Sequence, residues 1–220
     1  MRGRFIADNG LFMKLVMDHC SNIDSSAVGL LLDQEKAYDR VHPDYLRQVL
    51  TRIGIPDSFV DSICRLFFGT CLRVNVNGFL SGSVPQLRGL RQGDPLSPVL
   101  FNLAFEPFLR SVLHDPLFNG VSLPISTPAP VPLPPDMPAV KLLAYADDVI
   151  CLLNAPSDLD RLIQHYTSFR FLAPALFILR LGAPRYNRMI LIPGMIVLHL
   201  TRSLTLDFLS LRRLHNVIRF

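Results

Sequence analysis

Two apolar runs separated by adjacent carboxylates constrain the fold of this chain more than any other feature. The runs are residues 141–145 and 149–153, and Ala146, Asp147 and Asp148 lie between them. This pattern predicts two strands joined by a tight turn that carries the carboxylates at its tip. Because adjacent carboxylates repel each other, a bound divalent cation would account for the pair. An ordinary polar turn accounts for it at least as well, since Asp is common in turns.

A third carboxylate follows another apolar run. Residues 27–32 have the sequence AVGLLL, which predicts a buried strand, and Asp33 comes directly after it. Three carboxylates that meet at the ends of neighbouring strands can hold two Mg²⁺ ions about 3.5–4 Å apart, the arrangement for in-line phosphoryl transfer. Asp33, Asp147 and Asp148 are therefore the candidate metal ligands.

The other elements indicate an α+β fold. Apolar periodicity and helix-end residues predict helices over residues 43–53, 58–67, 95–107 and 157–166. Asp94 and Ser157 are the expected caps of the last two helices, and Pro107 is expected to kink or end the third. Asn77-Gly78 predicts the turn of a hairpin within residues 73–87. This order of elements predicts an antiparallel β-sheet backed by helices.

The formal net charge of +4 is unevenly distributed along the chain. Residues 1–160 contain thirteen Lys and Arg against seventeen acids, whereas residues 161–220 contain nine Arg and one acid. The basic balance thus belongs to the C-terminal part, and the body carries no bulk signal for nucleic acid. Four Cys without CxxC spacing are typical of a reducing compartment. With no signal peptide and no apolar run of about 20 residues, we expect an intracellular protein in the nucleus or cytoplasm, without a membrane span.

Three segments follow one another along the chain: LLLDQEKAYDRV at residues 30–41, RGLRQGDPLSPVLFNLAF at 88–105 and LLAYADDVICLL at 142–153. In wording and order they resemble motifs A, B and C of reverse transcriptases from non-LTR, LINE-type retrotransposons. GRFIADN at residues 3–9 is similar to the segment that precedes motif A. The resemblance covers about residues 3–166 and implies a polymerase palm over residues 1–166, with a truncated fingers region.

The resemblance also implies an activity and its partners. It implies an RNA-directed DNA polymerase that adds dNTPs to the 3′-OH of a DNA primer on an RNA template, with Mg²⁺ or, in its place, Mn²⁺. Asp33 and Asp147 match the family's two metal-ligating aspartates, and Asp148 matches the second carboxylate of the YADD turn. Neither a membrane nor an obligate protein partner is implied.

Further residues match positions that bind substrate in the family. Tyr38 matches the steric gate, where an aromatic ring excludes the 2′-OH of ribonucleotides; without the motif it would be interpreted as a core aromatic. The backbone carbonyl of Gln34 matches a further metal ligand. Gln92 and Gly93 match positions that contact the incoming nucleotide and the template. Arg91 is a candidate phosphate contact, or else an ordinary solvated charge.

The family pattern ends after Tyr166. Proline-rich residues 121–138 replace a shorter linker between motifs B and C, and residues 167–220 lack the lysine-bearing motif D. The last stretch shows neither helix nor strand periodicity, which favours a degenerate or frameshifted tail in loose contact with the body. A divergent thumb whose arginines bind phosphate is the alternative.

A second hypothesis for the function is therefore a non-catalytic retroelement remnant that at most binds nucleic acid through its Arg-rich tail. A third, an RNA-copying RNA polymerase, is disfavoured by Tyr38 and by the YADD turn.

Overall fold

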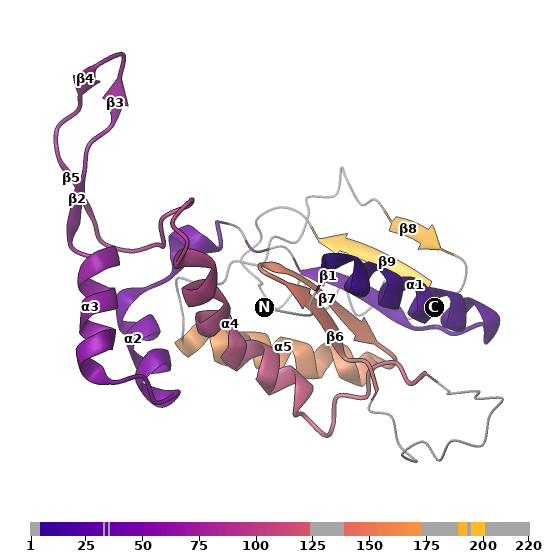
Figure 1. Ribbon diagram of the computed structural model, residues 1–220. Coiled ribbons are helices and arrows are strands. Elements are labelled where there is room, and N and C mark those ends of the chain that lie inside the picture. The colour runs from indigo at the N-terminus through magenta and orange to yellow at the C-terminus, as the bar shows by residue number, and fades with distance from the viewer. Residues whose placement is uncertain are drawn as a thin grey trace. The chain divides into compact units, whose positions relative to one another are not determined.

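A five-stranded sheet forms the centre of the first of two units into which the chain divides in a computed structural model (Figure 1). The first unit contains residues 1–35, 109–166 and 178–220, and the second contains residues 36–108 and 167–177. The structure describes residues 5–32, 34, 36–123, 139–172, 189–192 and 195–200. Residues 124–138, which make up most of the proline-rich segment, and residues 173–188 and 201–220 lie outside the described residues.

The sheet has the strand order β6-β7-β1-β9-β8. Its members are β1 (Val28–Leu32), β6 (Leu142–Tyr145), β7 (Asp148–Leu153), β8 (Met189–Ile192) and β9 (Met195–Leu200). The antiparallel hairpin of β6 and β7 and the buried strand β1 are the elements that the apolar runs predict. Strand β1 pairs antiparallel with β7, in a register that places Leu32 beside Val149.

Strand β9 departs from two expectations. It pairs with β1 in parallel, so the sheet is mixed and not purely antiparallel. The pairing also joins part of residues 167–220 to the centre of the sheet, where we expected only loose contact. The physical reason is that β1 has a second edge of N–H and C=O groups, and an apolar run such as MIVLHL can pair with them.

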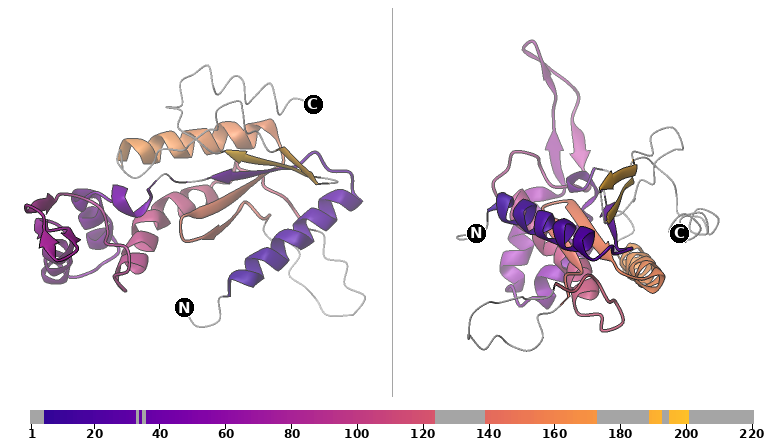
Figure 2. Two further views of the ribbon diagram at one scale, coloured as in Figure 1. Left: turned by 90° about the horizontal axis from the view of Figure 1, so that it is seen from above. Right: turned by 90° about the vertical axis from the view of Figure 1, so that its right-hand side faces the viewer.

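Helices α1 (Ile6–Asn22) and α5 (Pro156–Leu172) lie on opposite faces of this sheet (Figure 2). On the α1 face, Val16 and Cys20 form a buried cluster with Ala27, Val121 and Leu152. The sequence interpretation missed α1, although apolar residues at positions 13, 16, 17 and 20 have helical spacing. Within the described residues, no helix is both long enough and apolar enough to cross a membrane.

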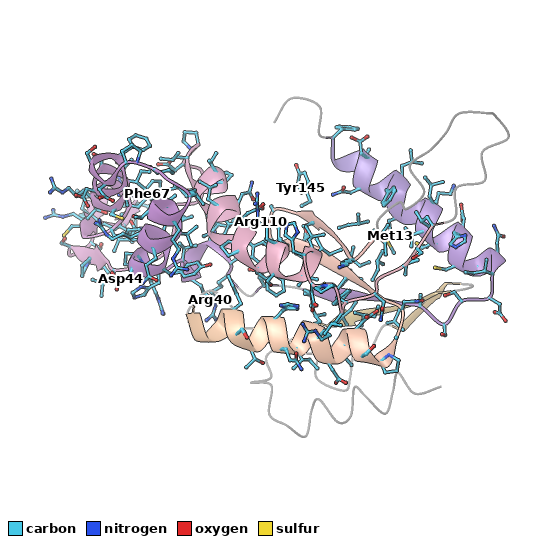
Figure 3. All side chains as sticks on the ribbon, turned by 90° about the horizontal axis from the view of Figure 1, so that it is seen from below. Met13, Arg40, Asp44, Phe67, Arg110 and Tyr145 are labelled. Carbon is cyan, nitrogen blue, oxygen red and sulfur yellow. The ribbon has the colours of Figure 1, made fainter. Side chains whose placement is uncertain are left out.

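The second unit packs its helices around aromatic side chains. It contains the 3₁₀ turn η1 (Tyr38–Arg40), α2 (Pro43–Arg52), α3 (Asp57–Phe67) and the first part of α4 (Ser97–Leu113). Phe101, Phe105 and Phe108 of α4 stack in succession, with ring centroids 5.8 and 5.5 Å apart. Phe67, at the end of α3, is also fully buried in this unit (Figure 3). A narrow ribbon of short strands, β2 (Thr70–Leu72), β3 (Asn75–Val76), β4 (Phe79–Leu80) and β5 (Val84–Gln86), follows α3.

Helix boundaries differ from the sequence interpretation in α4, which begins at Ser97, and in α5, which runs to Leu172. Helix α4 continues through Pro107 to Leu113, so this proline, which is exposed, does not end the helix; whether it kinks the helix stays a prediction. Ser157 lies inside α5 and does not cap it. The carboxylate of Asp158 takes that role, since it accepts the amide N–H of Asn154 at 2.8 Å and of Ala155 at 3.3 Å.

Asp158 also connects the start of α5 to a distant loop. Its buried carboxylate accepts the backbone N–H groups of Asn119 at 2.7 Å and Gly120 at 3.3 Å, together with the side-chain amide of Asn119 at 3.0 Å. One carboxylate thus accepts hydrogen bonds from both segments, including that of the buried Gly120 N–H, which would otherwise lack a partner.

We expect Asp158→Asn to lower the free energy of unfolding by about 3 kcal/mol, because the charge is lost and a donor replaces an acceptor. Urea denaturation followed by circular dichroism measures the change. The control is Asp160→Asn, at an exposed position of the same helix, which should change stability by less than about 0.5 kcal/mol. Equal effects of the two substitutions would contradict the anchoring role of Asp158.

A second buried carboxylate, that of Asp115, contacts α5 further along the helix, at Arg161 and His165. The Asp115 side chain is only 2% exposed, and its Oδ2 accepts hydrogen bonds from Nε of Arg161 and from Nε2 of His165, both at 2.7 Å. The Arg161 guanidinium holds the pKa of Asp115 well below its usual range; His165 and the amide of Leu117 act in the same direction, and burial opposes them. Ionised Asp115 therefore stabilises the folded chain.

This lowered pKa has a defined consequence for stability against pH. The stabilisation is fully present above the pKa of an unfolded Asp, about 3.9, and is lost as the pH falls towards the lower folded value. We expect Asp115→Asn to be less stable than the parent chain near neutral pH, with a difference that shrinks below about pH 4. Urea unfolding across this range measures the difference, and Asp18→Asn, at an exposed site, is the control. A difference that did not change with pH would exclude this linkage.

Candidate active site

The carboxylate pair lies at the turn between β6 and β7, as the sequence predicts. Tyr145 pairs with Asp148, so Ala146 and Asp147 form the two-residue turn. Ala146 has a φ of 53°, in the left-handed region that residues with a Cβ rarely adopt. Such a conformation costs of order 1–3 kcal/mol and persists only where the surrounding structure enforces it. Asp148 is exposed and Asp147 is half-buried, so both carboxylates are accessible.

The end of β1 lies beside the start of β7. Leu32 is paired with Val149, the residue after Asp148. Asp33 follows Leu32 in sequence but lies outside the described residues, so its approach to Asp147 stays a prediction. In the described part of the chain no three metal-binding side chains come together.

Gln34 is buried in the segment that follows β1. Its side chain is 4% exposed, and neither its Oε1 nor its Nε2 has a hydrogen-bond partner among the described residues. A buried amide without a hydrogen-bond partner destabilises the folded state by about 1–3 kcal/mol. Within the described part of the chain, Gln34 therefore offers an unused donor and an unused acceptor close in sequence to Asp33.

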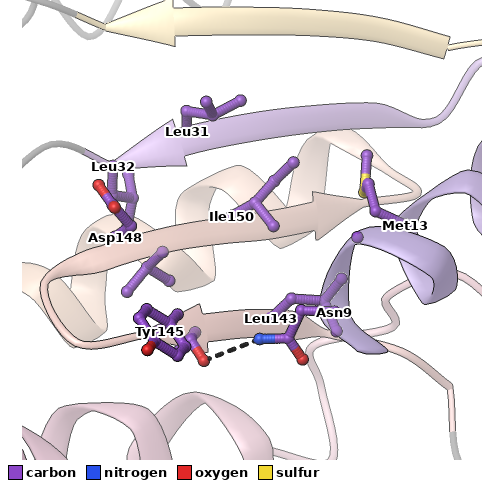
Figure 4. Close-up of a pocket in the computed structure, with 11 residues that line it drawn as sticks. Asn9, Met13, Leu31, Leu32, Leu143, Tyr145, Asp148 and Ile150 are labelled. Atoms are coloured by element: carbon purple, nitrogen blue, oxygen red, sulfur yellow. Dashed lines mark hydrogen bonds between the residues drawn. The ribbon is translucent and has the colours of Figure 1, made fainter. Parts of the chain in front are cut away.

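A groove of about 480 Å³ lies between α1 and the sheet, next to the carboxylate turn (Figure 4). Its walls are mainly apolar, with Met13, Leu31 and Ile150 among them, and Asp148 lies at one end. The Asn9 side chain donates a hydrogen bond to the Ala144 carbonyl at 3.1 Å, as the dashed line in Figure 4 shows. This bond ties α1 to β6 shortly before the turn. The sequence interpretation included Asn9 only as part of the GRFIADN segment.

In the second unit, the last residues of motif A (38–41) lie against the first residues of motif B (88–90). The Tyr38 ring is half-buried and stacks on Phe101, with centroids 4.7 Å apart. The Leu90 N–H donates to the Tyr38 carbonyl at 2.8 Å, and the Gly89 N–H donates to the Val41 carbonyl at 2.9 Å. The RGLRQGDP loop is therefore fixed to the turn that carries Tyr38.

Gly89 is required by this contact. Its φ is 88°, and a Cβ placed on it would lie 2.9 Å from both Cα and O of Asp39. Only a residue without a Cβ allows the two backbones to approach so closely. Gly93, with a φ of 90°, shares the conformation but has open space around it.

The other predicted substrate residues of this unit surround the turn before α4. Gln92 and Gly93 are exposed. The Arg91 guanidinium donates to the Leu66 carbonyl at 2.8 Å and to Oγ1 of Thr70 at 2.9 Å, while its Nε donates to Oε1 of Gln86 at 3.2 Å. Arg91 thus has a structural role at the base of the ribbon, and its phosphate contact stays a prediction.

The sequence matches a family model described as reverse transcriptase (RNA-dependent DNA polymerase) over residues 2–171. The chain belongs to the reverse transcriptase family. The match confirms the predicted family of RNA-directed DNA polymerases, and the relatives described next confirm its non-LTR retrotransposon branch. Reverse transcriptases use divalent metal ions and act on an RNA template and a primer with dNTPs.

Its relatives are proteins of transposable elements. The chain is 36% identical over 159 residues to the Transposon TX1 uncharacterized 149 kDa protein of Xenopus laevis, which is 72% of this chain and 11% of that protein. It is 35% identical over 106 residues to the Retrovirus-related Pol polyprotein from type-2 retrotransposable element R2DM of Drosophila melanogaster, 48% of this chain and 10% of the polyprotein. For the Pol polyprotein from type-1 retrotransposable element R2 of Popillia japonica the identity is 32% over 130 residues, 58% of this chain and 19% of that one. This reverse transcriptase chain thus spans between a tenth and a fifth of the length of these relatives.

The predicted site residues that the structure describes in this reverse transcriptase fall into two groups, one in each unit. Gln34, Asp147 and Asp148 belong to the first unit, and Tyr38, Arg91, Gln92 and Gly93 belong to the second. The first group carries carboxylate oxygens suited to divalent cations, and the second carries a ring, an amide and exposed backbone suited to a nucleotide.

The contrast between the two glycines is testable. Gly93→Ala should cost about 1–2 kcal/mol of stability, because Ala is strained at a positive φ. Gly89→Ala should cost about 1–3 kcal/mol more, because its Cβ also displaces the Asp39 backbone. Urea denaturation of both variants gives the difference. If Gly89→Ala proved no worse than Gly93→Ala, the close approach of the two motifs would be wrong.

Proposed function

We propose that this chain is the catalytic palm of an RNA-directed DNA polymerase of a retrotransposon, which joins dNTPs to a primer 3′-OH by two-metal nucleotidyl transfer. The observation that carries the proposal is the register of β1 on β7. With Leu32 beside Val149, Asp33 follows one strand end and Asp148 begins the adjacent strand. Residues far apart in sequence would thereby supply oxygen ligands at one end of these two strands.

The residues present fit a pair of Mg²⁺ ions, or of Mn²⁺ ions. Carboxylate oxygens are preferred ligands of these cations, and two adjacent carboxylates at a strained turn are better tolerated beside positive charge. Asp33, Asp147 and Asp148 would hold the ions, with the Gln34 carbonyl as a further ligand. When bound, the ions lower the barrier by polarising the phosphate oxygens and stabilising the charge that develops on them.

The second unit would select and hold the incoming nucleotide. The Tyr38 ring is stacked on Phe101 and its backbone is held by Leu90, so its position is well determined and suited to a steric gate. Gln92 and Gly93 are exposed and would contact the nucleotide and the template strand, and Arg91 would contact a phosphate. Such a gate acts by excluding the 2′-OH, and therefore favours dNTPs over NTPs.

Residues 1–166 would then form the palm with a remnant of the fingers. For residues 167–220 we retain a degenerate or frameshifted tail as the hypothesis, with a divergent thumb as the alternative. The Arg-rich composition of this segment also supports the second candidate function, a non-catalytic remnant that binds nucleic acid through its tail.

Primer extension tests the proposal. Positioning of the 3′-OH can contribute roughly 7–11 kcal/mol to such a reaction, and it depends on fingers and thumb as well as on the palm. We expect little or no processive extension by the 220-residue chain on a primed RNA template, even at high Mg²⁺ or Mn²⁺. A chimera that adds the fingers and thumb of a related reverse transcriptase should extend the primer.

The matched variant is Asp147→Ala in the same chimera, which should abolish extension. If the chimera failed to extend, or if Asp147→Ala left extension intact, the catalytic proposal would be wrong. Robust extension by the unmodified chain would instead identify residues 167–220 as a working thumb.

A further inference from the structure

The ribbon of residues 70–86, which we call the arm, projects from the end of α3 in the second unit (Figure 1). Its base is the pairing of β2 with β5, and its tip is the pairing of β3 with β4. At the tip Val76 pairs with Phe79, and Asn75 pairs with Leu80. Figure 2 shows the same projection from a second direction.

The arm exposes an unusual amount of apolar surface. Phe79 is 82% exposed, the highest value among the large hydrophobic residues of the described chain. The other exposed apolar side chains between the base and the tip are Leu72, Val74, Val76, Leu80 and Val84. A two-stranded ribbon gains little stability by itself, and several exposed apolar side chains gathered on one projecting element indicate a place where a partner binds.

The arm is nevertheless well defined by local bonds. Asn77 and Gly78 both have a positive φ, 51° and 88°, as the tight hairpin turn requires. At the base, Arg91 bonds both strands through Thr70 and Gln86. These contacts make the arm a preorganised element, so a partner does not have to order it on binding.

The charge around the arm selects the kind of partner. Residues 62–93 contain four Arg and no acid, whereas the remainder of residues 1–160 contains nine basic and seventeen acidic residues. Arg73 lies on the arm and is exposed, and Arg65 and Arg88 are exposed on either side of it. A second copy of the chain would bring like charges together, whereas a polyanion is attracted.

An exposed aromatic ring on an element that also carries an exposed arginine suits an unpaired nucleic acid strand. Bases stack on exposed aromatic rings, and arginines bind the phosphates between them. In a duplex the bases are already stacked on one another and are not available to an exposed ring.

We propose that the arm binds single-stranded nucleic acid, with Phe79 stacked on an unpaired base and Arg73 bound to a phosphate. The inference rests on the proposed function, which makes nucleic acid the substrate. It adds a binding element outside the catalytic residues.

The test is fluorescence anisotropy of the 220-residue chain with a fluorescein-labelled single-stranded RNA. Phe79→Ser should weaken binding about tenfold, the typical loss when a stacked base loses its aromatic partner. Phe59→Ser is the matched control, because Phe59 is also exposed, at 56%, but lies on α3 outside the arm; it should bind as the parent chain does. Arg73→Gln should make the slope of log affinity against log salt concentration shallower by about 1, the value for one phosphate contact. Arg52→Gln, on α2, should leave this slope unchanged.

Several outcomes would overturn the proposal. They are absence of RNA binding by the parent chain, parental affinity in Phe79→Ser, and equal or tighter binding of a duplex. A change in oligomeric state with Phe79→Ser, measured by sedimentation, would identify the arm as a contact between copies. Circular dichroism checks that each variant is folded.

The two proposals fail separately. In the chimera with added fingers and thumb, Asp147→Ala should abolish extension and leave RNA binding unchanged. Loss of affinity in Phe79→Ser without any extension by the parent chimera would support the arm and reject the catalytic function. Primer extension by the parent chimera, with parental RNA affinity in Phe79→Ser, would support the catalytic function and reject the role of the arm.

Discussion

The pairing of β1 with β7 is the contact on which the first unit depends. It joins residues 28–32 to residues 149–153, and most of these side chains are buried. Their burial contributes the hydrophobic stabilisation, roughly 25 cal/mol for each Å² of apolar surface, that offsets the cost of closing so long a loop. Without this pairing, the end of β1 and the carboxylate turn would have no fixed relation.

The strained turn illustrates the same dependence. Ala146 adopts a backbone conformation that is unfavourable for a residue with a Cβ, and nothing in the local sequence favours it. The turn is held because β6 and β7 are paired on both sides and β7 is fixed to β1. Asn9 adds a bond from α1 to the strand that leads into the turn. The energy stored in the turn is thus supported by the sheet and the helix around it.

In the second unit, the main contact holds the RGLRQGDP loop (residues 88–95) against the short turn η1 (Tyr38–Arg40). Gly89 allows the two backbones to meet, and the stack of Tyr38 on Phe101 connects the turn to the aromatic core of α4. Arg91 extends the same loop to the base of the arm. The RGLRQGDP segment therefore connects the proposed steric gate to the proposed nucleic-acid arm.

The sequence by itself determined the elements whose signals are local. The apolar runs around Asp147 and Asp148 predict the hairpin, Asn77-Gly78 predicts the arm's turn, and the three motifs identify the family, because each signal lies within a few neighbouring residues. Only the tertiary structure decided which distant groups meet. The parallel partner of β1, the bonds of Asp158 to the backbone of Asn119 and Gly120, and the bonds of Arg91 to Leu66 and Thr70 join segments that are far apart in sequence. The periodicity of apolar residues does not predict such contacts, because a carboxylate or guanidinium meets a distant partner only when the elements have packed together.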